Sequence, residues 1–223
     1  MLIGEIEAAR GYRASFYMLH TDWYFRAEPS GPPSTYLLDA CHRLASLGHE
    51  VAIHNNAIAA ALRWGGQPAE ILERDIAYLR SSGFDIDGSV AHGEQLCHTV
   101  AFVNSEVFVE CPRPMLGEPD RTLRYEDPAT GATTEIALRP VPMAEMGLEY
   151  EAGYIGHSSY LSDSSGTWHR PIEEVHEQFV DAGGLLQVLT HPIWWAFGDE
   201  SYKPRDASVT AFPGSLLRQK QGR

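Results

Sequence analysis

Three segments that are typical of buried β-strands each end on a histidine. The segment "VAIH" ends at His54, "GSVAH" at His92 and "QVLTH" at His191, while a fourth segment, "YLSD", ends at Asp163. Imidazole binds divalent metal ions and titrates near neutral pH. If the strands are parallel neighbours, their carboxyl ends meet at one edge of the sheet, and the three imidazoles share one pocket.

A single histidine at the end of a strand usually only marks the point where the buried strand ends, or donates a hydrogen bond to a loop carbonyl. Three such ends in one chain favour a shared site. His20 ends another strand-like segment and is either a fourth residue of that site or the start of a loop.

Aromatic residues near these strand ends could contact a substrate. Trp194 and Trp195 follow "LTHPI" and form either a wall that stacks on a sugar ring or a hydrophobic plug over the end of a barrel. Tyr160, in "YLSD", is the third residue that we expect to bind a substrate.

Apolar spacing and turn residues predict helices that alternate with strands along the chain. The expected helices cover residues 3–10, 36–48, 67–83 and 170–184. The expected strands cover residues 12–19, 49–54, 84–93, 158–163 and 185–191, and a hairpin is expected around residues 128–131. Ser34 or Thr35 could cap the second helix, and Pro68 suits the first turn of the third. Because most connections are too long for hairpins, the pattern predicts an α/β fold with a parallel sheet, open or closed into a barrel.

Length and composition limit the class of protein. The 223 residues suit one large α/β domain, expected over residues 1–203, with a polar tail over 204–223 that could be disordered. The net charge of −13 argues against binding nucleic acid or an anionic membrane, since both attract basic patches. The three cysteines, Cys41, Cys97 and Cys111, show no Cys-x-x-Cys spacing and are expected to be reduced and mostly buried. There is no apolar run of ~18 residues and no signal-peptide pattern, so a cytoplasmic location is expected.

Five segments together resemble a known family. "RASFYML", "LASLGHEVAIHNN", "DIDGSVAHG", "YLSDSSGTW" and "GLLQVLTHPIWW" come in the order found in the polysaccharide deacetylase-like proteins, a carbohydrate esterase superfamily with a distorted (β/α)₇ barrel. The resemblance covers about residues 3–197, and the combination of "GHEVAIH", "AHG" and "LTHP" is its most specific part.

The resemblance implies metal-assisted removal of an acetyl group from an N-acetylated sugar. His54 then matches a metal-ligand histidine, and His92 is a further ligand or a substrate contact. His191 matches the general acid. The implied cofactor is a divalent metal ion, expected to be zinc, and the implied substrate is a small molecule or an oligosaccharide.

The sequence departs from the family pattern at two places. Members have two histidines spaced His-x-x-x-His, whereas Ile58 occupies the second position here. The strand that carries the family's two aspartates would precede Met1, so either the natural protein is longer or it lacks both aspartates. A third metal ligand could be Asp163, His191 or one of those aspartates, and Asp163 could instead orient His191.

Two alternatives to a deacetylase stay open. One is a non-catalytic barrel that binds a glycan or a partner protein, which the missing aspartates favour. The other is a metal-dependent amidohydrolase that acts on a small cytosolic amide, which the lack of a secretion signal favours. The oligomeric state is not predicted.

Overall fold

The computed structural model describes residues 2–29, 31–111, 121–168 and 170–191. Its contacts divide the chain into two compact units, Met1–Tyr154 and Ile155–Arg223, and each is described by itself. Trp194, Trp195 and the predicted tail over 204–223 lie outside the described residues. The expectation of a single domain over residues 1–203 stays a prediction.

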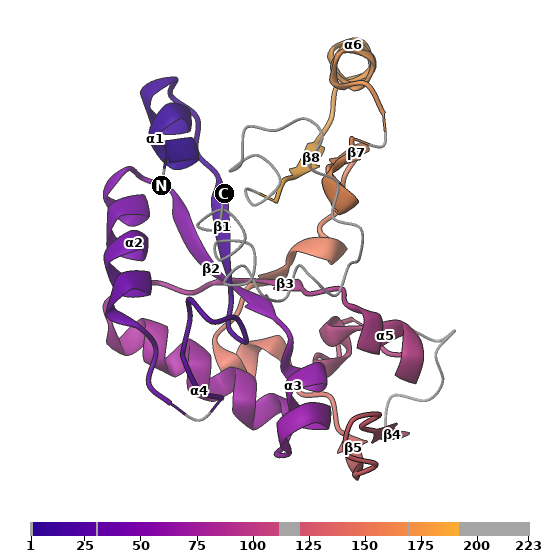
Figure 1. Cartoon of the computed structure of the whole chain (residues 1–223). Helices are drawn as coiled ribbons and strands as arrows, with labels where there is room; N and C mark the ends of the chain where they lie inside the picture. The colour runs from indigo at the N-terminus through magenta and orange to yellow at the C-terminus, as the bar shows by residue number, and fades with distance from the viewer. Residues whose placement is uncertain (1, 30, 112–120, 169, 192–223) are drawn as a thin grey trace, which may run out of the picture. The chain divides into compact units, whose positions relative to one another are not determined.

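The first unit is built on a four-stranded parallel sheet (Figure 1). Its strands are neighbours in chain order, namely β1 (Ser15–Leu19), β2 (Glu50–Asn55), β3 (Gly88–Ala91) and β6 (Tyr150–Glu151). The helix α2 (Thr35–Ser46) connects β1 to β2, and α3 (Ala57–Trp64) and α4 (Pro68–Ser81) connect β2 to β3. The predicted α/β fold with parallel strands is therefore confirmed.

Helices α2 and α4 cover one face of this sheet. Phe16, Met18, Val51 and Ile53 belong to one apolar cluster with the inner residues of both helices, which are Leu37, Cys41, Leu44, Leu72, Ile76 and Leu79. Ser34 caps α2 by accepting a hydrogen bond from the Leu37 N–H at 3.2 Å, and Pro68 occupies the first turn of α4, as the sequence predicts. The short helix α1 (Leu2–Ala9) is joined to the sheet by His49, whose Nε2 lies 2.8 Å from the carbonyl of Gly4.

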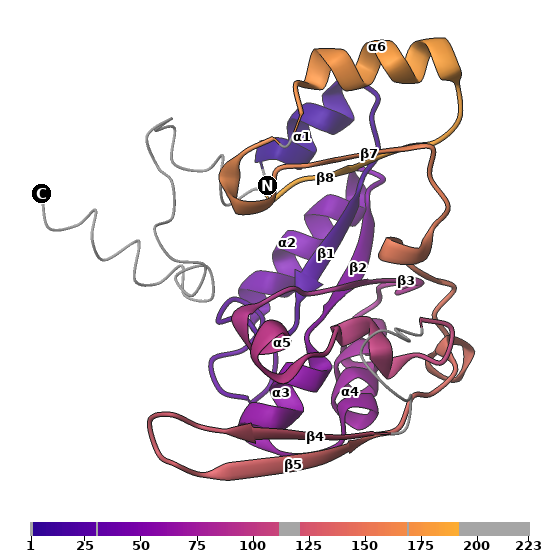
Figure 2. The same ribbon diagram turned by 90° about the vertical axis from the view of Figure 1, so that its right-hand side faces the viewer.

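Most of helix α3 is buried, and a hairpin that follows later in the chain covers part of it. The antiparallel strands β4 (Arg121–Glu126) and β5 (Thr133–Leu138) form the predicted hairpin, which lies beside α3 (Figure 2). Leu123, Ile136 and Leu138 of the hairpin pack with Ile58 and Leu62 of α3. The first six residues of α3, from Ala57 to Leu62, are all apolar and buried, so they leave no alternation of apolar and polar residues that would predict a helix.

The remaining elements of the first unit are short. They are α5 (Gln95–Val100) and the single-turn 3₁₀ helices η1 (Asn104–Val107), η3 (Met143–Met146) and η4 (Ala152–Tyr154). Strand β6 has only two residues, which is too short for an alternating pattern, and it too was not expected. Cys41, Cys97 and Cys111 are all buried, as predicted.

The second unit contains one parallel βαβ motif. Strands β7 (Ser159–Ser162) and β8 (Leu186–Leu189) pair in parallel, and α6 (Ile172–Ala182) connects them (Figure 2). A 3₁₀ turn, η5 (Ser164–Gly166), follows β7. Both strands and the helix fall within the ranges predicted from the sequence.

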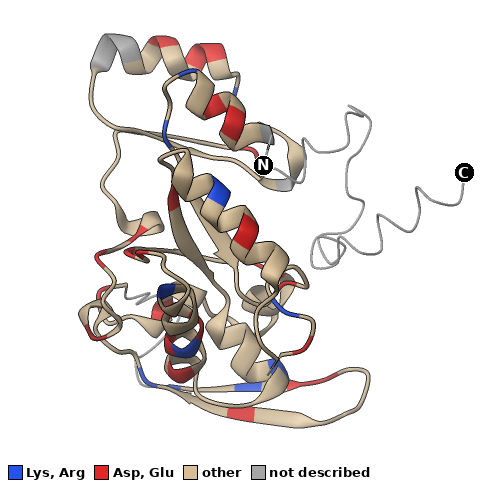
Figure 3. Ribbon diagram, turned by 90° about the vertical axis from the view of Figure 1, so that its left-hand side faces the viewer, with Lys and Arg blue, Asp and Glu red and all other residues tan. Residues whose placement is uncertain are grey.

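Strand pairing in the described part of the chain gives three separate sheets and no closed barrel. The distorted (β/α)₇ barrel therefore stays a prediction. No helix among the described residues is long and apolar enough to cross a membrane. Acidic residues recur along α1 and α6, and neither of these helices carries Lys or Arg (Figure 3).

Gly88 leaves space for a tyrosine that ties the sheet together. Gly88 and Tyr150 are register partners, and the Tyr150 hydroxyl donates to Glu50 Oε1 at 2.7 Å and lies 3.1 Å from the Tyr17 hydroxyl. A Cβ atom at position 88 would lie 2.2 Å from the Tyr150 ring. Only glycine therefore allows the ring to cross β3 at this point.

We expect Gly88→Ala to lower the free energy of unfolding by about 1–3 kcal/mol, because it forces the Tyr150 ring off its site. Gly93→Ala is the matched control, since a Cβ there meets nothing within 4 Å. Urea denaturation of both variants measures the effect. Equal midpoints for the two variants would show that the Tyr150 position does not matter for stability.

Candidate functional site

His54 and His92 meet at the carboxyl end of the parallel sheet. The register pairs His54 with Val90, so His92, two residues further on, projects from the same face as His54. His92 Nδ1 lies 3.3 Å from His54 Nε2, and the two half-buried rings are nearly perpendicular at 84°. The structure thus brings together two of the three imidazoles that the sequence predicts to share a pocket.

The backbone of His92 is held on both sides by asparagines. Its N–H donates to the Asn55 carbonyl at 2.7 Å. Its own carbonyl accepts a hydrogen bond from Asn104 Nδ2 at 2.8 Å. Behind it, the N–H of Ala91 donates to the buried Glu151 carboxylate at 2.9 Å. These bonds fix the position from which the His92 ring reaches His54.

The same asparagines cap the buried start of α3. The N–H of Ala57 donates to Asn55 Oδ1 at 3.0 Å, and the N–H groups of Ile58 and Ala59 both donate to Asn104 Oδ1, at 3.1 and 3.3 Å. Asn104 Nδ2 also donates to Asn56 Oδ1, at 2.9 Å.

Asn55, Asn56 and Asn104 are the only asparagines in the chain, and all three are at most 3% exposed. They form one hydrogen-bonded group, which we call the asparagine clamp. It joins the end of β2, the start of α3 and the residue after β3.

His20 faces away from this pair. It follows β1 on the opposite side of the strand from Leu19, which is the register partner of His54. Its ring is buried, with Nδ1 2.7 Å from Asp75 Oδ2 of α4 and Nε2 accepting the Asn56 N–H at 2.9 Å. Of the two interpretations left open for His20, the structure therefore favours a residue packed beneath the loop over a residue of the site.

Asp163 and His191 form a separate pair in the second unit. Asp163 follows β7 and is fully buried, and His191 comes two residues after β8. His191 Nδ1 lies 2.7 Å from Asp163 Oδ1, and the His191 N–H donates to both carboxylate oxygens, at 3.0 and 2.9 Å. This geometry favours an orienting role for Asp163. Because the units are described separately, the predicted meeting of His191 with His54 and His92 stays a prediction.

Two other predicted positions can be placed. Tyr160, on β7, is 43% exposed, and its ring lies 5.6 Å from that of His157. Ile58, at the position where the resemblance implies a second histidine, is completely buried in the apolar cluster of α3 and the hairpin. A polar ligand at position 58 would face that cluster.

The spacing of His54 and His92 suits a shared metal ion. Two nitrogen atoms that bind one tetrahedral zinc ion at about 2.0–2.1 Å lie about 3.3 Å apart, and these two ring nitrogens are 3.3 Å apart. The same distance suits a hydrogen bond in which one ring donates. Among the described residues, no three His, Cys, Asp or Glu side chains form a group that could hold a metal ion.

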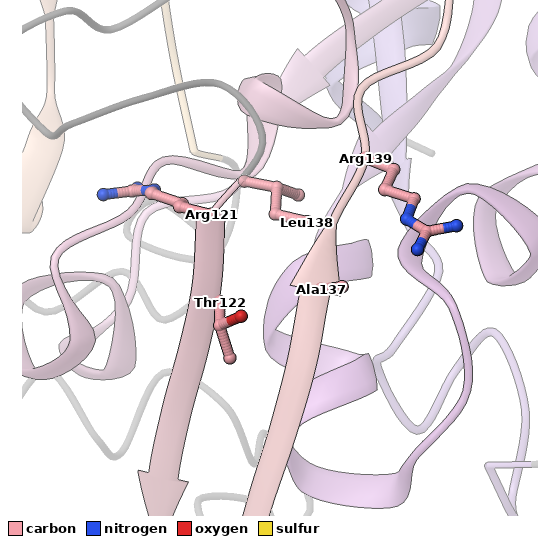
Figure 4. Close-up of a pocket in the computed structure, with 5 residues that line it drawn as sticks. All are labelled: Arg121, Thr122, Ala137, Leu138 and Arg139. Carbon is pink, nitrogen blue, oxygen red and sulfur yellow. The ribbon is translucent and has the colours of Figure 1, made fainter.

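A surface depression lies elsewhere, at the hairpin. It is lined by Arg121, Thr122, Ala137, Leu138 and Arg139, and the two guanidinium groups point away from each other (Figure 4). Arg121 donates to the Ala101 carbonyl at 2.8 Å and to Glu106 at 2.9 Å. This depression contains neither histidine.

Sequence reasoning missed the asparagine clamp and Asp75. Two signals were present: the pair "NN" directly after His54, and an aspartate on the apolar face of α4, between Leu72 and Leu79 in the helical spacing. An acidic residue on a buried helix face needs partners in the fold, and its buried partners are His20 and Arg26.

We expect Asn104→Ala to lower the free energy of unfolding by about 3 kcal/mol or more, because it removes the partner of four buried polar groups. Chemical denaturation measures this loss. Thr99→Ala, at an exposed position of α5, is the control and should change stability by less than about 0.5 kcal/mol. Similar losses for the two variants would contradict a central role of the clamp.

The loop after β1 contains a carboxyl group, that of Asp22, with a raised pKa. Burial raises the pKa of Asp22 to about 6, although a hydrogen bond from the Trp23 N–H partly lowers it. Its protonated form therefore stabilises the fold below about pH 4, and this contribution is lost as the pH rises through 6. We expect Asp22→Asn to be more stable than the natural protein above pH 6 and about equally stable near pH 4. Thermal unfolding across this range measures the difference, and a difference independent of pH would refute the assignment.

No protein-family model matches the chain. No curated protein and no solved structure matches it either.

Proposed function

We propose that this protein is a metal-dependent hydrolase of the polysaccharide deacetylase-like type, which removes acetyl groups from N-acetylated sugars. The observation that carries the proposal is the pair of histidines at the carboxyl end of the parallel sheet, with ring nitrogens 3.3 Å apart. Parallel α/β proteins collect their active sites at this end of the strands.

The proposed architecture is a distorted (β/α)₇ barrel. Two features support it: the strands of the first unit are neighbours in chain order, and the second unit continues with another parallel βαβ motif. Strands that follow each other around a sheet in this way are arranged as in a barrel, whereas open doubly wound sheets reverse their order.

His54 and His92 are the proposed metal ligands. A bound divalent ion, expected to be zinc, would polarise the amide carbonyl and lower the pKa of a water molecule. The asparagine clamp holds the two rings at the required spacing before the ion binds, which reduces the entropy lost on binding. A catalytic zinc typically has about three protein ligands.

His191 is the proposed general acid, and Asp163 orients it. Because the carboxylate accepts the Nδ1–H, the proton to be transferred is carried on Nε2. The hydrogen bonds from the His191 backbone N–H to the same carboxylate hold the ring in place. In this role His191 donates a proton to the amine that leaves when the amide bond breaks.

We expect one equivalent of Zn²⁺ to bind the purified full-length chain, and His54→Ala and His92→Ala each to weaken binding at least tenfold. Isothermal titration measures the affinity. His42→Ala, at an exposed position of α2, is the matched control and should bind as the natural protein does. Equal affinities for all four proteins would show that the histidine pair is not the metal site.

We expect the zinc-loaded protein to deacetylate acetylated chito-oligosaccharides, and His191→Ala to lower kcat about 10²–10⁴-fold, since general acid catalysis contributes this much. Asp163→Asn should lower kcat as well, while His176→Ala, exposed on α6, should not. Glycan binding without turnover would instead support the non-catalytic barrel. Turnover of small amides alone would support the amidohydrolase.

A further inference from the structure

We infer that Asp75 is a positioning residue for the His54–His92 pair and acts on it through His20 and the asparagine clamp. This inference rests on the proposed metal-binding role of that pair. The connection consists of hydrogen bonds that all lie within the first unit.

The first step is the tautomer of His20. A backbone N–H can only donate, so His20 Nε2, which accepts the Asn56 N–H at 2.9 Å, must carry no proton. The ring proton therefore lies on Nδ1, which donates to Asp75 Oδ2 at 2.7 Å. Asp75 thus selects the tautomer that Asn56 requires.

The second step is the charge of Asp75. Burial alone would raise the pKa of this carboxyl, but hydrogen bonds from His20 and Arg74 and the charge of Arg26 together lower it. Arg26 and Asp75 form a buried ion pair. The carboxylate is therefore an acceptor only, and it cannot donate to His20 in place of the ring.

The third step leads from His20 to the histidine pair. Asn56 lies two residues after His54, and its side chain accepts a hydrogen bond from Asn104, which also holds the His92 carbonyl. Asn55, between His54 and Asn56, holds the His92 N–H through its carbonyl. A shift of Asn56 therefore moves the backbone of both histidines.

Two substitutions of His20 separate its two contacts. In His20→Gln, the side-chain oxygen can reach the place of Nε2 and still accept the Asn56 N–H. In His20→Asn, the shorter amide stays near Asp75 and leaves Asn56 without its acceptor. A third variant, Asp75→Asn, can donate to His20 Nδ1 and so favours the wrong tautomer, with a proton on Nε2 directed at the Asn56 N–H.

We expect Asp75→Asn and His20→Asn to weaken Zn²⁺ binding about 10–100-fold, the usual effect of residues that orient metal ligands. His20→Gln should stay within about threefold of the natural protein. Glu73→Gln, at an exposed position of the same helix, is the matched control and should bind zinc as the natural protein does. A purely structural role would lower the unfolding temperature of the variants but leave the zinc affinity of the folded protein unchanged, and that result would overturn the inference.

A measurement without metal separates this inference from the proposed function. Proton–nitrogen NMR spectra of the full-length protein report the tautomer of His20 and the amide signal of His92. We expect both to change in Asp75→Asn, and the His92 signal to stay in place in His20→Gln. If the natural protein binds no zinc but these shifts occur, the proposed function fails and the positioning role holds. If the His92 signal is the same in all variants, the positioning role is wrong.

Discussion

The buried start of helix α3 is the constraint on which the rest of the first unit depends. Backbone N–H groups at the start of a helix have no partner within the helix. At the start of α3 these groups are buried away from water. Asn55 and Asn104 satisfy three of them, and His20 satisfies the N–H of Asn56. Asn55 and Asn104 also hold the backbone of His92. The residues that cap α3 therefore also position the histidine pair.

The alternation of side chains along parallel strands decides which histidines can act together. His54 and His92 project from the face opposite α2 and α4, whereas His20 projects toward α4 and meets Asp75. The register therefore decides on which face of the sheet a histidine at a strand end lies, because side chains alternate between the two faces along the strand. His20 and His54 both lie at strand ends and so look equally suited to the site. The register shows that they lie on opposite faces of the sheet.

The elements with clear periodicity could be predicted from the sequence, and those without it could not. Helices α2, α4 and α6 have one apolar face, and their ranges were expected. The first six residues of α3 are all apolar, and β6 is two residues long, so neither shows an alternation of apolar and polar residues. The histidine pair could be predicted because both members end strands. The clamp could not, since Asn104 lies 48 residues from Asn56 and lacks any local signal of its partner.

The burial of α3 has a consequence for the hairpin of β4 and β5. This hairpin interrupts the connection between β3 and β6 and could be mistaken for a dispensable insertion. It supplies Leu123, Ile136 and Leu138, which pack against the buried residues Ile58 and Leu62 of α3. A shorter hairpin would expose Ile58 and Leu62 to water. The start of α3 would then be less well fixed, and so would the asparagines that hold His92. The length of the hairpin is therefore constrained by the histidine pair, although the hairpin contributes no residue to that pair.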